Sequence, residues 1–117
     1  MKKTDINKFF DASKKLKDLN PFEEALVPRY AIIDAVEQEL NTIKKSIPAN
    51  KKTPEIEQGI KLAEKLIDGQ RKIYAEIKNM RDLHLVTGGI HDKHVDIESF
   101  VNGVNVFMDT LRSAQNK

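Results

Sequence analysis

Histidines and aspartates gather in the last third of the chain, and in this sequence they are the only residues grouped like metal ligands. They are Asp82, His84, His91, Asp92, His94 and Asp96. A zinc site needs its ligands in a fixed tetrahedron, but these residues lie on both sides of Gly88-Gly89 and their spacing matches no common zinc motif. We therefore expect solvated or locally hydrogen-bonded histidines, with no metal and no other cofactor.

The residue types used in covalent and phosphoryl-transfer chemistry are not arranged for it. None of the serines stands in a nucleophile-elbow context, and the chain has no cysteine. Gly88-Gly89 lacks the G-x-x-x-x-G-K spacing of a phosphate-binding loop. Glu64 and Asp68 are expected on an exposed helix face, where carboxylates form ion pairs more often than an acid–base couple. The sequence predicts a protein that is not an enzyme.

The composition describes one small domain. The chain has 117 residues, of which 39% are hydrophobic and 32% charged, which is enough for a modest core. The absence of cysteine favours a reducing compartment, and the N-terminus lacks the apolar stretch of a secretion signal. No stretch is apolar enough to span a bilayer, so we expect no membrane partner.

Apolar residues recur at three and four residues, which predicts helices and no strand. A first helix is expected over residues 4–19, with Thr4 as its N-cap. Pro21 and Pro28 bracket a predicted turn, and a second helix is expected over residues 29–47. Residues 48–52 form a polar connector, after which Thr53-Pro54 predicts the start of a third helix.

The third helix carries the strongest pattern, a seam with alternating steps of four and three residues. The seam consists of Ile56, Ile60, Ala63, Ile67, Gln70, Tyr74 and Ile77, and Leu66, Ile73 and Met80 widen it. Nothing breaks the helix before Gly88, so it is expected to be longer than the second helix and to leave part of its seam uncovered. We therefore predict an antiparallel hairpin, similar to a coiled coil, that oligomerises.

The last segment begins near Val95 and is predicted as a helix, with an extended stretch over residues 104–108 as the alternative. The all-α fold then has three regions. Residues 1–20 are a basic N-terminal helix, residues 21–87 are the helical hairpin and oligomerisation core, and residues 88–117 are a C-terminal segment.

Three stretches occur together in a suggestive order. They are the opening Asp5-Ile6-Asn7-Lys8-Phe9-Phe10-Asp11-Ala12-Ser13, the hairpin split by Lys51-Lys52-Thr53-Pro54, and the late Asn105-Val106-Phe107-Met108. In order and spacing they resemble the small terminase subunit of T-even-type tailed bacteriophages. The resemblance implies a ring of helical hairpins, in the cytoplasm of an infected bacterium, that binds double-stranded viral DNA. It also implies a non-catalytic subunit that regulates the ATPase and nuclease of the large terminase subunit.

The resemblance also suggests roles for two sets of residues. The positions that match the family hairpin would carry contacts between subunits: Ile56, Ile60, Ala63, Ile67, Tyr74 and Ile77. An ordinary core within one chain explains the same positions equally well. Val106, Phe107 and Met108 match the C-terminal box and would contact the large subunit, with packing against the hairpin as the alternative.

Two groups of lysines are candidates for phosphate contact without base readout. The N-terminal group, on the one stretch that is locally basic, is Lys2, Lys3, Lys8, Lys14, Lys15 and Lys17. The group at the tip of the predicted hairpin is Lys44, Lys45, Lys51 and Lys52. The alternative for both groups is a solvated helix face.

A second function fits the same pattern of helices. A small helical inhibitor or immunity-type protein would bind a single host protein through an apolar helix face, with neither a ring nor DNA. The two functions predict different masses in solution, because the inhibitor would be a monomer or dimer and the packaging subunit a large homo-oligomer.

Overall fold

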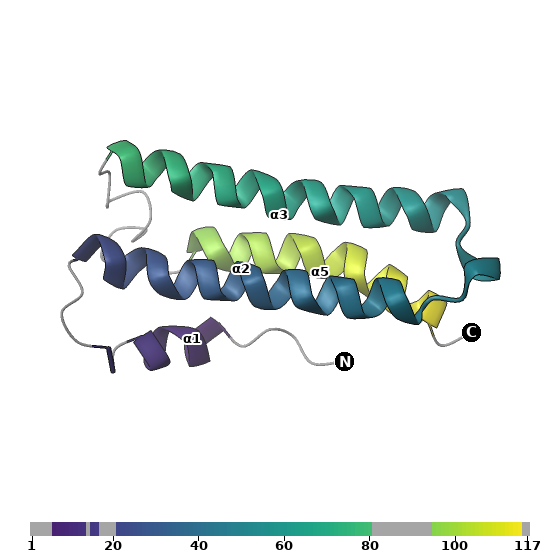
Figure 1. Cartoon of the computed structure of the whole chain (residues 1–117), viewed down its shortest axis with the longest axis horizontal. Helices are drawn as coiled ribbons and strands as arrows, with labels where there is room; N and C mark the ends of the chain where they lie inside the picture. The colour runs from purple at the N-terminus through teal and green to yellow at the C-terminus, as the bar shows by residue number, and fades with distance from the viewer. Residues whose placement is uncertain (1–5, 14, 17–20, 81–94, 116–117) are drawn as a thin grey trace.

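The computed structural model describes residues 6–13, 15–16, 21–80 and 95–115, and these residues form helices without a strand. The protein is therefore all-α, as predicted. The helices are α1 (Ile6–Ser13), α2 (Pro21–Ser46), the short 3₁₀ helix η1 (Ala49–Lys51), α3 (Pro54–Met80) and α5 (Val95–Gln115). Figure 1 shows α2 and α3 as two long helices joined through η1, with α5 beside them and α1 beside α2.

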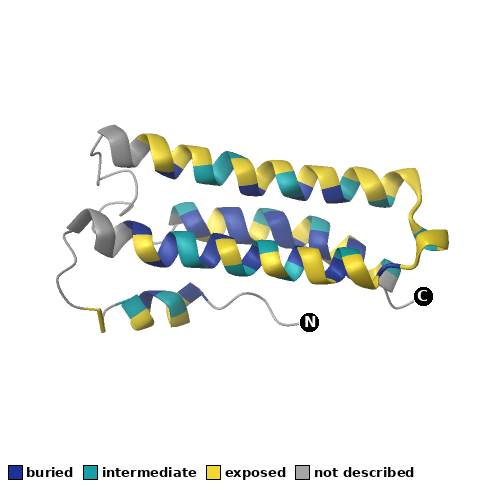
Figure 2. Ribbon diagram, viewed as in Figure 1, coloured by how far each residue is buried: buried dark blue, intermediate teal, exposed yellow. Residues whose placement is uncertain are grey.

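The core lies where α2, α3 and α5 face one another, and Ile6 and Phe10 of α1 extend it. Figure 2 shows the buried residues on the inward faces of these helices and exposed residues on the outward faces. The fully covered aliphatic side chains include Ile32, Ile33 and Val36 of α2, Ala63 and Ile67 of α3, and Ile97, Val104, Met108 and Leu111 of α5. The bundle therefore needs all three long helices to exclude water from its centre.

The α2 helix begins eight residues earlier than predicted and continues through Pro28. The prediction of a turn between Pro21 and Pro28 is wrong. A proline inside a helix loses one backbone hydrogen bond and costs about 3 kcal/mol, but Pro28 and its neighbours Leu26 and Arg29 are buried. The packing of these buried side chains keeps the backbone helical through the proline.

The α1 helix is shorter than predicted, because it ends at Ser13 instead of near residue 19. The Ser13 hydroxyl donates a hydrogen bond to the carbonyl of Phe10. Two backbone hydrogen bonds that span three residues follow, from the Lys15 amide to the Ala12 carbonyl and from the Leu16 amide to the Ser13 carbonyl. Short polar side chains that bond to the nearby backbone favour helix ends. The predicted N-cap Thr4 lies outside the described residues.

The α3 helix begins as predicted. The amide of Ile56 donates to the Thr53 hydroxyl at 3.3 Å, the amide of Glu57 bonds to the Thr53 carbonyl at 3.0 Å, and Pro54 occupies the first helical position. The helix is described as far as Met80, so its predicted extension to residue 87 falls outside the described residues. The α5 helix confirms the helical prediction for the last segment, and residues 104–108 lie within it instead of being extended.

Candidate functional site

The lysines predicted to contact DNA lie in two separate places. Lys44 and Lys45 end α2 and Lys51 ends η1, so with Lys52 they surround the connection between α2 and α3. Lys45 and Lys52 are exposed, whereas Lys44 pairs with Glu64 of α3 at 3.0 Å. We call these four residues the tip lysines.

Two of the N-terminal lysines, Lys8 and Lys15, are described, and they are not brought to the tip. Lys8 on α1 and Lys15 just after it are exposed, and α1 lies toward the opposite end of the bundle (Figure 1). Lys2, Lys3, Lys14 and Lys17 lie outside the described residues. Lys8 and Lys15 are therefore separate from the tip lysines, and the two groups must be tested independently.

The predicted oligomer seam of α3 faces the protein's own core. Ile60, Ala63, Ile67 and Tyr74 are buried, and Ile56 is half-buried against the core. The side chain of Ile77 lies outside the described residues. The placement of these residues matches the alternative reading of the seam, packing within one chain, and leaves little of the seam for another subunit.

The C-terminal box is divided between core and surface. Met108 is completely buried and Phe107 is half-buried against the core, but 67% of Val106 is exposed. Successive helix residues point about 100° apart, so three consecutive residues cannot all face one partner. Val106 is the member of the box that another protein can contact directly.

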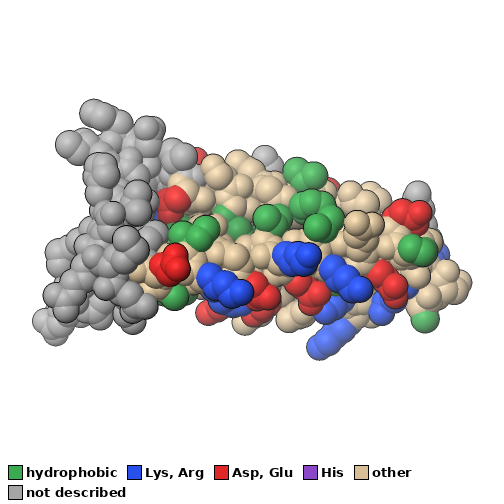
Figure 3. All heavy atoms as spheres, turned by 90° about the horizontal axis from the view of Figure 1, so that it is seen from above, with side chains coloured by type: hydrophobic (Ala, Val, Ile, Leu, Met, Phe, Trp, Pro, Cys, Tyr) green, Lys and Arg blue, Asp and Glu red, His purple; other side chains and the backbone are tan. Residues whose placement is uncertain are grey.

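A row of exposed apolar side chains runs along α3 on a face different from the seam. Leu62, Leu66 and Ile73 are 37%, 39% and 50% exposed, and Gly69 lies between the last two at helical spacing. Seen from above α3, hydrophobic side chains extend along the molecule with a band of charged side chains at one side (Figure 3). We call these four residues the α3 row. The sequence pattern predicts Leu66 and Ile73 as a widening of the seam, and the packed structure shows that both are exposed.

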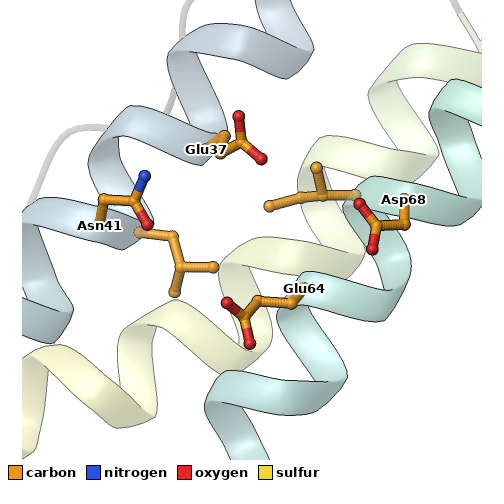
Figure 4. Close-up of a pocket in the computed structure, with 6 residues that line it drawn as sticks. Glu37, Asn41, Glu64 and Asp68 are labelled. Atoms are coloured by element: carbon orange, nitrogen blue, oxygen red, sulfur yellow. The ribbon is translucent and has the colours of Figure 1, made fainter.

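A cleft of about 270 Å³ opens between α2 and α3. Its floor is Leu40 and Ile67, and its rim is Glu37, Asn41, Glu64 and Asp68, with the labelled side chains shown in Figure 4. Arg71 donates hydrogen bonds to Glu37 at 2.9 and 3.0 Å and to Asp34 at 2.7 Å.

The carboxylates of the cleft serve the packing of the two helices. The hydrogen bond from Arg71 lowers the pKa of Glu37 below its usual range. At the other end of the cleft, Lys44 forms an ion pair with Glu64. Glu64 thus makes the ion pair expected from the sequence. Within the described ranges, no three histidine, aspartate or glutamate side chains are grouped so that they can hold a metal ion. The histidines and aspartates from Asp82 to His94, for which no metal was expected, lie outside those ranges.

A largely buried polar junction, which sequence reasoning missed, joins the four described α-helices. Arg29 of α2 donates to both carboxylate oxygens of Asp96 on α5, at 2.9 and 3.2 Å, and the Tyr74 hydroxyl of α3 donates to the same carboxylate at 2.5 Å. The ring of Phe10 on α1 lies 5.0 Å from the Arg29 guanidinium. We call these four residues the four-helix junction. Burial, with the Asp96 hydrogen bond, raises the pKa of Tyr74.

No family model matches the chain, and no significant match was found among curated proteins or solved structures. Among the described helices, none has an apolar stretch long enough to cross a bilayer.

Proposed function

We propose that the protein is a non-catalytic DNA-packaging subunit similar to the small terminase subunit of T-even-type phages. In this proposal α2 and α3 form the hairpin, and copies assemble into a ring in the cytoplasm of the infected bacterium. The ring binds double-stranded viral DNA and modulates the large terminase subunit, which Val106 contacts. The three sequence stretches that resemble the family support the proposal, because they fall on α1, on the α2–α3 connection and on α5.

The observation that carries the proposal is the cluster of tip lysines. Four cations within nine residues surround one end of the α2–α3 pair, and two of them are exposed. Lysines that contact phosphates supply affinity without sequence readout, and the affinity falls steeply with salt. Each copy would bind DNA weakly, and repetition around a ring would multiply the effect.

Charge reversal at the tip tests the DNA contact. We expect Lys45→Glu, Lys51→Glu and Lys52→Glu together to weaken binding of a double-stranded DNA by at least about tenfold at low salt. The matched control changes the same three lysines to arginine, which keeps the charge and should keep the binding. Fluorescence anisotropy with labelled DNA measures both. A separate variant with glutamate at positions 14, 15 and 17 tests the N-terminal group. Undiminished binding in both glutamate variants would reject DNA contact by these lysines.

A single-partner binding protein, such as a small inhibitor or immunity-type protein, is the second candidate. The observation that favours it is the burial of Ile60, Ala63, Ile67 and Tyr74 within one chain, because this core is complete without a ring. The mass in solution, by light scattering coupled to size exclusion, separates the two candidates. A particle of many copies supports packaging, and a monomer or dimer supports the inhibitor.

A further inference from the structure

The α3 row and Val106 belong to one face of the bundle, formed by α3 and α5 on the side away from α2. Two contacts fix how these helices lie beside each other. A Cβ on Gly59 would lie 3.7 Å from the Leu111 side chain, and Tyr74 bonds to Asp96. In both pairs the residue numbers add to 170, so the two helices are antiparallel. Residue n of α3 therefore lies at the same level along the bundle as residue 170 − n of α5.

The centre of this face combines projecting apolar side chains with glycines. The α3 part presents Leu66 beside Gly69, and the α5 part presents Val106 beside Gly103. A Cβ built on Gly69 or on Gly103 meets nothing within 4 Å, so the surface above each glycine is open. Each helix thus offers one projecting side chain and one open position where a side chain of another molecule can sit.

The two edges of the face carry opposite charge. A lysine directly precedes each large residue of the α3 row: Lys61, Lys65 and Lys72. At 100° per residue these exposed lysines lie along the edge of the face away from α5. Along the opposite edge, on α5, lie the exposed residues Glu98, Asn102 and Asp109. Asp109 also pairs with Arg112, and 71% of its side chain is exposed.

We propose that this face binds the same face of a second copy about a two-fold axis. The axis lies in the plane of the face, runs parallel to the helices and passes between α3 and α5, so that α3 of each copy lies against α5 of the other at the same level. The level rule then places Leu66 next to Gly103 of the partner subunit. It places Val106 between Leu62 of the partner subunit and Leu66 of the partner subunit. A symmetric interface of this kind needs a self-complementary surface, and a leucine beside a glycine with a valine between two leucines meets that requirement.

The charges decide which occupant fits. The same rotation brings the basic edge of one copy against the acidic edge of the other. Lys61 faces Asp109 of the partner subunit, and Lys72 faces Glu98 of the partner subunit. An anionic membrane would be repelled by the acidic edge, and a helix with acidic residues along one side would match the basic edge alone. The inference goes beyond the proposed function and does not depend on it, because it requires neither DNA nor a large subunit.

Charge reversal followed by mixing tests the pairing. The first variant carries Lys61→Glu and Lys72→Glu, and the second carries Glu98→Lys and Asp109→Lys. Each variant alone places like charges against each other at both edges, so we expect its self-association to weaken by at least about tenfold. An equimolar mixture restores opposite charges at both edges and should associate as tightly as the unmodified protein. Sedimentation equilibrium over a wide concentration range measures all three samples, and far-ultraviolet circular dichroism checks that each variant is folded.

Every outcome decides the proposal. Loss of association in each variant and its recovery in the mixture support it, whether the unmodified protein is a dimer or a larger particle built with this contact. A monomeric unmodified protein at all concentrations overturns it. So does a mass that either reversal leaves unchanged, or a mixture that fails to associate. If a variant does not fold, Leu66→Gln with the control Leu16→Gln replaces it. Leu66 lies in this face and the exposed Leu16 lies outside it, so only Leu66→Gln must weaken association.

Discussion

Two buried arginines stabilise the bundle in different ways. Arg29 has 2% of its side chain exposed, and the Asp96 carboxylate that pairs with it also accepts a hydrogen bond from Tyr74. Arg112 has 9% exposed and donates to Glu39, to Asp109 at 2.6 Å and to Asn105 at 3.4 Å. The Arg112 Nε and the Asn105 Nδ2 are nonetheless buried without a hydrogen-bond partner in the described part of the chain.

The difference shows how the surroundings of an ion pair decide its contribution to stability. Removing one partner of a buried, fully bonded pair leaves an uncompensated charge and costs about 3–5 kcal/mol. An arginine with an unsatisfied donor already carries part of the desolvation cost. Of the two carboxylates that pair with Arg112, Asp109 is 71% exposed, and Glu39, at 24%, is about as exposed as the Asp96 partner of Arg29, at 21%. The Arg29 pair is therefore expected to be essential, and the Arg112 group to be nearly replaceable by an apolar side chain.

The largest expected effect is from Arg29→Met, which removes the cation from the four-helix junction. We expect the free energy of unfolding to fall by about 3 kcal/mol, because Asp96, with 21% of its side chain exposed, keeps a largely buried charge with one donor left. The matched control Arg112→Met should change it by about 1 kcal/mol or less, since Asp109 is already 71% exposed and Arg112 has an unsatisfied donor. Urea unfolding at neutral pH measures both. Equal losses in the two variants would contradict the comparison.

Tyr74→Phe removes one hydrogen bond from the junction and keeps the ring. We expect a loss of about 1–2 kcal/mol, because the Asp96 carboxylate loses a buried donor. The aromatic contact with Tyr30, at 6.0 Å between ring centroids, should persist in this variant. Tyr30→Phe is the control, and urea unfolding should show little change for it. A similar loss in both variants would mean that the hydroxyl of Tyr74 has no special role.

Alkaline pH sharpens the same comparison. Burial raises the pKa of Tyr74, so the folded state holds this proton more tightly than the unfolded chain does. The resulting stability is fully present below the ordinary tyrosine pKa of about 10 and is lost as the pH rises above it. We expect the unfolding free energy between about pH 9 and 11 to fall more steeply for the unmodified protein than for Tyr74→Phe. Parallel curves would argue against a protonated Tyr74 in the junction.

The smallest effect is expected at Arg71, which pairs with Glu37 on the rim of the cleft. Its side chain is 30% exposed, and its partners Asp34 and Glu37 are 64% and 43% exposed. We expect Arg71→Gln to cost about 1 kcal/mol or less, and high salt to shrink the difference. Arg71 lowers the pKa of Glu37, so this contribution is present at neutral pH and lost in acid. A loss as large as that of Arg29→Met in urea unfolding would contradict the role of burial.

Local signals in the sequence predicted much of the fold. Thr53 and Pro54 marked the start of α3 because capping is decided by neighbouring residues. The seam of α3 was found for the same reason, since spacing along one helix defines its apolar face. The turn predicted at Pro28 was wrong because the packing of its buried neighbours keeps this segment helical. The first helix was predicted too long, and Leu16 lies beyond the end of α1 with 54% of its side chain exposed.

The surfaces were harder to predict than the helices. The tip lysines were located from sequence because they are adjacent to the connection between two helices. The four-helix junction was not, because Arg29 and Asp96 are 67 residues apart and a lone charged residue gives no sign that it is buried. The exposure of the α3 row likewise depends on where α5 packs, which periodicity within α3 cannot supply.

The four-helix junction also gives the molecule a local optical reporter. The chain has two tyrosines and no tryptophan, and the rings of Tyr30 and Tyr74 meet at the junction in an edge-on arrangement. Near-ultraviolet circular dichroism of tyrosine therefore reports the packing of this one place, while the far-ultraviolet signal reports the helices as a whole. If the tyrosine signal disappears at a lower temperature than the helical signal, the helices separate at the junction before they unwind.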